Sequence, residues 1–192
     1  MNERINPQVT TGVLLIFILI ALALRCAIWW LFSHDPNLYI QPDSLEYLKL
    51  ATEIFEQHSF TSFSRTPTYP LFLGTIEYFT DWDASGLVVI QILLSLANIY
   101  LIWQISKSLF SPRAQIILLA LYSLDFASAM GANYLLTETL FTTLLLLACL
   151  SFIRCTNANQ PILSALSCGG ALSLLILCRP IAVLLPIVFT AY

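Results

Sequence analysis

Residues 11–32, TGVLLIFILIALALRCAIWWLF, form an apolar run that determines the class of structure open to this chain. The only charged side chain in the run is Arg25. A helix of about 20 apolar residues crosses the roughly 30 Å of hydrocarbon in a bilayer, so the run predicts a membrane span. The triplet Ala21-Leu22-Ala23 resembles a signal-peptide cleavage site. Because the apolar run continues past it to Leu31, an uncleaved anchor is favoured.

Further apolar runs follow, and the composition agrees with them. The 192 residues are 58% hydrophobic and 10% charged, whereas roughly a quarter of residues are charged in soluble domains. The sequence therefore predicts an all-α, polytopic membrane protein: one domain, residues 1–192, built as a bundle of transmembrane helices. The spans predicted after the first are 84–106, 114–131, 135–153 and 161–178.

A sixth apolar run begins at Ile181 and reaches the last residue, Tyr192. Its helix would rise only about 18 Å, which is too short to cross a bilayer. We therefore expect a truncated or partial polypeptide, whose activity alone is an open question.

Basic residues near the span ends predict the orientation in the membrane. On the side of the membrane that carries the loop 33–83, only Arg179 lies at a span end, whereas Lys49 and Arg65 lie deep in the loop. Because cytoplasmic loops carry the excess of Lys and Arg, we expect a cytoplasmic N-terminus and an external loop. The basic residues on the predicted cytoplasmic side are Arg4, Lys107, Arg113 and Arg154.

The net charge and the cysteine spacing indicate which ligands and cross-links this chain is not expected to have. The net charge of −3 gives no indication of a nucleic-acid partner. The chain has no phosphate-binding glycine loop, so a nucleotide sugar in a Rossmann-like site is not supported. The five cysteines have no CxxC spacing, and we expect neither disulfides nor a zinc site. They are Cys26, Cys149, Cys155, Cys168 and Cys178.

The external loop, residues 33–83, contains two predicted helices. Residues 43–57 are amphipathic, which is typical of a helix on the membrane surface. Residues 67–79 predict a second helix that is too short to span, and its Leu71-Phe72-Leu73 face is expected to enter the membrane interface.

The charged residues of this loop are the main candidates for a site. Asp43 is either a functional carboxylate or the N-cap of the first loop helix, with Glu46 completing a capping box. The planar guanidinium of Arg65 suits a phosphate, with Lys49 as a weaker second cation. Alternatively, Arg65 pairs with an acid of the loop. Tyr69 either stacks on a sugar or anchors the loop at the headgroups.

Four charged residues lie at or inside predicted spans. Glu138 begins a span, where the helix dipole favours a negative charge. Asp125 lies within a span and is either a second polar group of the site or a structural partner of Arg25 or Arg179, and the structural role is favoured. Arg25 is expected to extend to the headgroups. Arg179 either does the same or meets a lipid phosphate.

The order of motifs resembles a known family. After the first span come Pro42-Asp43-Ser44-x-x-Tyr47-x-x-x-Ala51 and Arg65-x-Pro67-x-Tyr69-Pro70-Leu71-Phe72-Leu73; later come Leu135-Leu136-Thr137-Glu138-Thr139-Leu140-Phe141 and Cys178-Arg179-Pro180. This order is similar to the N-terminal half of polytopic GT-C glycosyltransferases. That group contains the dolichyl-phosphate-mannose protein mannosyltransferases and the aminoarabinose transferases of lipid A, and the likeness is greatest to their bacterial family 39-like relatives. The resemblance covers nearly the whole chain, although members usually continue with several more spans.

The resemblance implies an inverting transferase that moves a sugar from a polyprenyl-phosphate donor to a lipid, glycan or protein acceptor. It places the enzyme in the bacterial cytoplasmic membrane, with its site on the outer face. Asp43 would deprotonate the acceptor or hold a divalent metal ion near the donor phosphate, and Arg65 would bind that phosphate. Glu138 would face the same cavity and position acceptor, metal or loop.

Two other classes stay open. A non-catalytic membrane protein or an inactive transferase remnant would agree with the early end of the chain. A transporter would need inverted repeats and broken helices near the membrane midplane, and the sequence shows no such pairing.

Overall fold

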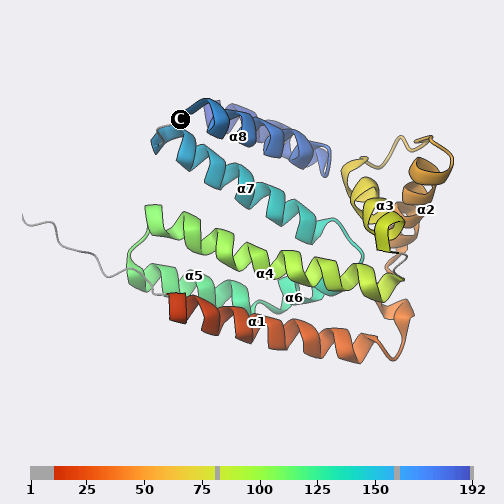
Figure 1. Ribbon diagram of the computed structural model, residues 1–192, viewed down its shortest axis with the longest axis horizontal. Coiled ribbons are helices and arrows are strands. Elements are labelled where there is room, and N and C mark those ends of the chain that lie inside the picture. The colour runs from red at the N-terminus through yellow and green to blue at the C-terminus, as the bar shows by residue number, and fades with distance from the viewer. Residues whose placement is uncertain (1–10, 81–82, 158–160, 191–192) are drawn as a thin grey trace, which may run out of the picture.

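The computed structural model describes residues 11–80, 83–157 and 161–190, and these residues form helices and connecting turns without a strand. Among them, three helices are long and apolar enough to cross a membrane. They are α1 (Thr11–Phe32), α4 (Ala84–Leu109) and α7 (Glu138–Asn157). In Figure 1, α4 lies between α1 and α7 and contacts both. The prediction of an all-α bundle with long apolar helices is confirmed.

The segment predicted as one span over 114–131 is divided into two helices. α5 (Pro112–Leu124) and α6 (Phe126–Asn133) meet at Asp125 with a bend of 47°. Asp125 leaves the helical conformation, with φ −65° and ψ 108°, and its carboxylate accepts a hydrogen bond from the backbone N–H of Ser128 at 2.7 Å. The carboxylate thus caps α6. A continuous helix over 114–131 was therefore wrong, because the acidic residue starts a new helix.

The last predicted full span is shorter than expected. α8 (Pro161–Ile176) lies along α7 in Figure 1, and its 16 residues rise about 24 Å as helix. It ends before Cys178 because Arg179 precedes a proline and is extended, with φ −146° and ψ 117°. The apolar segment that follows is divided between η2 (Pro180–Leu184) and α9 (Leu185–Thr190).

Both predicted loop helices are present at one end of the bundle (Figure 1). After η1 (Pro36–Tyr39) come α2 (Pro42–Glu56) and α3 (Thr68–Thr80), within two residues of the predicted bounds. The two pack on each other, and Leu73 is wholly buried. Gly74 permits this close crossing, because a Cβ there would lie 2.5 Å from the Phe55 ring. The expectation that Leu71-Phe72-Leu73 enters the membrane interface is therefore wrong for Leu73.

Arg25 lies inside the bundle. The side chain has no exposed surface; its Nε donates to Ser95 Oγ of α4 at 2.7 Å and one terminal nitrogen to Ser128 Oγ of α6 at 2.9 Å. The other terminal nitrogen donates to the Ala21 carbonyl at 3.3 Å. The predicted extension to the headgroups is wrong, because hydroxyls of two neighbouring helices supply acceptors within the bundle.

Candidate functional site

Arg65 lies between two carboxylates that α2 presents on one face. One terminal nitrogen donates to Asp43 Oδ1 at 2.7 Å, and the other lies 3.4 Å from Asp43 Oδ2. The Nε donates to Glu46 Oε2 at 2.6 Å. Asp43 and Glu46 are three residues apart, so one turn of helix aligns them. The pairing of Arg65 with loop acids, which the sequence left as the alternative, is present, and its phosphate role stays a prediction.

This arrangement keeps the arginine charged and the acids accessible. The hydrogen bonds that Arg65 donates to Glu46 and Asp43 raise its pKa above the usual value. The Asp43 side chain is 54% exposed and that of Glu46 is 44% exposed. A ligand can therefore approach the carboxylates from solvent while the guanidinium stays bound between them.

The start of α2 fixes where these carboxylates lie. The N-cap is Gln41, and a capping box links its side chain and backbone to Ser44. Pro42 occupies the first turn, where its missing N–H costs nothing. Asp43 is therefore not the cap, and Glu46 is not the cap partner, so both predictions were wrong. The first-turn position of Asp43 still favours a negative charge.

The ring of Tyr47 packs against the guanidinium of Arg65. The guanidinium carbon lies 5.2 Å from the centroid of its ring, a cation–π distance. Burial raises the pKa of the Tyr47 phenol, while the charges of Arg65 and Arg179 lower it. The charges of two arginines that are far apart in sequence thus act on the same phenol.

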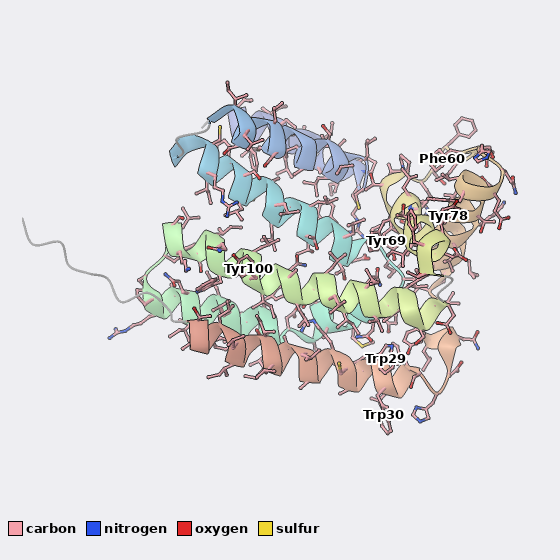
Figure 2. The ribbon with its side chains drawn as sticks, in the orientation of Figure 1. Trp29, Trp30, Phe60, Tyr69, Tyr78 and Tyr100 are labelled. Atoms are coloured by element: carbon pink, nitrogen blue, oxygen red, sulfur yellow. The ribbon has the colours of Figure 1, made fainter. Side chains whose placement is uncertain are left out.

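Tyr69 connects Tyr47 to the helix bundle. Its ring meets Tyr47 edge-on at 5.0 Å, and its hydroxyl donates to Gln91 Oε1 of α4 at 2.7 Å. Gln91 in turn donates to the Tyr134 carbonyl at 2.6 Å. The ring is wholly buried, and Figure 2 shows it where α3 meets the bundle. An exposed Tyr69 anchoring the headgroups was therefore wrong, and its role toward substrate stays a prediction.

A second ion pair joins Arg179 to Glu138. One terminal nitrogen of Arg179 donates to Glu138 Oε1, and its Nε donates to Thr137 Oγ1 at 2.6 Å. The Arg179 side chain is 39% exposed. The second oxygen of Glu138, Oε2, is shielded from solvent and has no hydrogen-bond partner. This carboxylate begins α7 and still has an acceptor oxygen free.

Backbone contacts hold the two ion pairs together. Thr66, next to Arg65, donates from its Oγ1 to the Cys178 carbonyl at 2.8 Å, and Cys178 precedes Arg179. The Thr68 N–H donates to the Leu177 carbonyl at 3.3 Å. The segment before α3 is therefore fixed to the end of α8. We call the five charged residues so assembled the polar corner: Asp43, Glu46, Arg65, Glu138 and Arg179.

Two predicted charged residues lie elsewhere. Lys49 is 76% exposed and pairs with Glu53 at 3.7 Å, one turn further along α2 than the carboxylates of the polar corner. Asp125 caps α6 and forms no ion pair among the described residues, although the pocket of about 260 Å³ that it lines also includes Glu138. The sequence predicted Asp125 as a structural partner of Arg25 or Arg179; no ion pair to either is present among the described residues, and its carboxylate caps α6 instead.

The described residues offer few side chains that could ligate a metal ion. Within the described ranges, no group of three or more His, Cys, Asp or Glu side chains is placed to hold a metal ion. Asp43 and Glu46 of α2 both face the guanidinium of Arg65. The residues present therefore do not fit a metal site, and the metal-holding role of Asp43 stays a prediction.

Three side chains that the sequence did not single out complete the arrangement. Tyr47 stood within the first motif, and its spacing of four residues from Asp43 could have placed it on the same face of α2. Thr137 also stood within a quoted motif, directly before Glu138, whereas Gln91 gave no comparable signal, because a single amide in an apolar helix is common. Only the structure shows that Gln91 accepts the hydrogen bond of Tyr69 and that Thr137 accepts one from Arg179.

A family model described as Dolichyl-phosphate-mannose-protein mannosyltransferase matches residues 64–192, from the residue before Arg65 to the end of the chain. No curated protein and no solved structure matches the chain. Because the match covers more than half of the chain, the chain belongs to this family of GT-C glycosyltransferases. It is accordingly a multi-pass membrane protein of a family that uses a lipid-linked sugar donor and an acceptor.

Proposed function

From this membership and the geometry of the polar corner, we propose that the chain transfers a sugar from a polyprenyl-phosphate donor to an acceptor hydroxyl or amine, with inversion at the sugar carbon. The observation that supports the proposal is the convergence of two arginine–carboxylate pairs from four segments of the chain. Phosphate and carboxylate compete for the same guanidinium geometry. An arginine of the polar corner can therefore exchange its carboxylate partner for a phosphate.

Arg65 is the proposed phosphate ligand. Its side chain is 25% exposed, and the bond to Asp43 is the more exposed of its two. Glu46, bonded to Nε, fixes the plane of the guanidinium. The two terminal nitrogens, which now hold Asp43, would turn to two oxygens of the donor phosphate. Arg179 follows Cys178, whose carbonyl is bonded to Thr66 beside Arg65, and would supply the second positive charge.

This exchange would release Asp43 as a base. While Arg65 donates to both of its oxygens, the Asp43 carboxylate is held toward the guanidinium. With Arg65 on the phosphate, Asp43 accepts the proton of the acceptor hydroxyl as the oxygen attacks the anomeric carbon. The bond from that carbon to the phosphate oxygen breaks, and the electron pair leaves with the phosphate. One base suffices, because the phosphate leaves without protonation.

Glu138 is the proposed positioning carboxylate. Its Oε1 fixes Arg179, and its unpartnered Oε2 can accept a hydrogen bond from an acceptor or from the donor sugar. The polar corner would lie on the outer face of a bacterial cytoplasmic membrane, as the positive-inside pattern favours.

The test is sugar release from a panel of labelled undecaprenyl-phosphate sugars by membranes containing the chain. We expect Asp43→Asn to lower turnover by about 100-fold or more, the range seen for loss of a general base. Glu56→Gln is the matched control, since Glu56 is an exposed acid on the same helix outside the polar corner. Turnover that is equal in Asp43→Asn and Glu56→Gln would contradict the proposal.

A further inference from the structure

A pocket of about 450 Å³ adjoins the polar corner, between α2 and the segment 61–64. It shares Glu46 with the polar corner, so one carboxylate belongs to both. The left-handed residue His58, with φ 52°, ends α2 and turns the chain back along the helix. The pocket therefore follows from this turn, and its wall contains Glu46, Lys49, Glu53, Thr61, Phe63 and Ser64.

Each acid of the wall already has a cationic partner. Glu46 is paired with Arg65, and Glu53 is paired with Lys49. Hydroxyls bond to the same acids: Thr61 Oγ1 donates to Glu53 Oε2 at 2.7 Å, and Ser64 Oγ lies 3.4 Å from Glu46 Oε1. The wall therefore offers many hydrogen-bonding groups, and its two acids and one lysine leave one excess negative charge. The excess negative charge disfavours a phosphate, and because each acid already has a cationic partner, an uncharged ligand with several hydroxyls is favoured over a basic peptide.

Phe63 adds an apolar surface to this polar wall. The side chain is fully exposed, so the fold itself gains nothing from its burial. Figure 2 shows Phe60, in the same segment, at the edge of the molecule away from the helices of the bundle. The flat C–H face of a sugar ring is the kind of uncharged surface that packs on such an aromatic ring while its hydroxyls bond to neighbouring polar groups.

We propose that this pocket binds the acceptor, and that the acceptor is an uncharged saccharide. The inference rests on the proposed function, since it names the acceptor class for the same site. Glu46 borders the pocket, and Asp43 lies one turn before it on the same face of α2. A saccharide that packs on Phe63 and bonds to Glu53 and Glu46 would extend one hydroxyl toward the proposed base.

The experiment measures saccharide binding directly, without transfer. Full-length chain in detergent is titrated with maltose, cellobiose, mannobiose and chitobiose, and contacts are followed by saturation-transfer NMR. We expect at least one of these neutral disaccharides to bind at or below about 10 mM, and Phe63→Ala to weaken it about tenfold or more. Phe79→Ala, an exposed aromatic on α3 outside the pocket, should leave binding unchanged.

The outcomes separate this inference from the proposed function. Loss of sugar release in Asp43→Asn, with Phe63-dependent saccharide binding intact, supports both. Phe63-dependent binding in a chain that releases no sugar supports the pocket and contradicts the transferase. Absence of saccharide binding at about 10 mM, binding that Phe63→Ala does not weaken, or binding of a serine-rich peptide in place of the saccharides overturns the inference.

Discussion

Arg25, inside the bundle, and Arg65, in the segment between the loop helices α2 and α3, differ in their hydrogen-bond partners. Arg25 is wholly buried and donates to two hydroxyls and a carbonyl, all uncharged. Arg65 is partly exposed and donates to two carboxylates. Hydroxyl partners belong to the fold and cannot be exchanged without disrupting it. Carboxylate partners at a solvent-exposed edge can be replaced by a phosphate, so we connect Arg25 with stability and Arg65 with function.

The largest expected effect is on activity at Arg65. Arg65→Ala removes the proposed phosphate ligand, and sugar release should fall by about 100-fold or more, as when a single charge-stabilising donor is deleted from an active site. Arg65→Lys should recover only part of this loss, because a lysine cannot bind a phosphate in two places. The measurement is kcat/KM for the labelled donor. Full activity in Arg65→Ala would remove the distinction between the two arginines.

The second effect is on stability at Arg25. Arg25→Ala leaves a cavity and deprives Ser95 and Ser128 of their partner, so the free energy of unfolding in detergent should fall by about 3 kcal/mol. Arg65→Ala should change it by less than about 1 kcal/mol, as exposed ion pairs do. Chemical denaturation of both variants is the measurement. An equal loss in the two would show that the loop ion pairs also hold the fold.

A smaller effect concerns the tyrosine that joins the two regions. Tyr69→Phe removes one hydroxyl and leaves Gln91 Oε1 buried without its donor, which should destabilise the fold by about 1–3 kcal/mol. Tyr78→Phe is the control, because Tyr78 is an exposed tyrosine on the same helix. Equal unfolding free energies for the two variants would contradict the role given to the Tyr69–Gln91 bond.

The smallest effect is the response to salt. Raising the salt concentration shortens the distance over which exposed charges interact, to about 3 Å at 1 M. Donor affinity, which depends on Arg65, should therefore weaken with salt, while the stability contributed by Arg25 should not change. Thermal melting and donor titration at two salt concentrations test this. A stability loss with salt that disappears in Arg25→Ala would contradict the assignment of Arg25 to a shielded network.

Helical class and the loop helices were predictable because each depends on local sequence. The apolar run 11–32 coincides with α1, and the amphipathic pattern after Pro42 predicted α2 to within one residue. The break at Asp125 was not predicted. An apolar run with one acid inside it has the composition of a span, and only the capping bond to Ser128 shows that a new helix begins.

The candidate site was predicted as a set of residues but not as a set of contacts. Asp43, Arg65, Glu138 and Arg179 were all named, and the structure joins them in two ion pairs. Lys49 and Tyr69 were named with them, yet one faces a neighbouring pocket and the other is buried. A sequence gives the spacing of charges within a helix, whereas the pairing of residues 43 with 65 and 138 with 179 depends on long-range packing.

The central claim is that Arg65 and Arg179 bind one donor phosphate together. A double-mutant cycle tests it most directly: donor affinity is measured for the wild-type chain, Arg65→Ala, Arg179→Ala and the double variant. We expect a coupling free energy of about 0.5–3 kcal/mol between the two substitutions, the range for groups that act on one ligand. Effects that simply add would contradict the claim, because they would place the two arginines in separate sites.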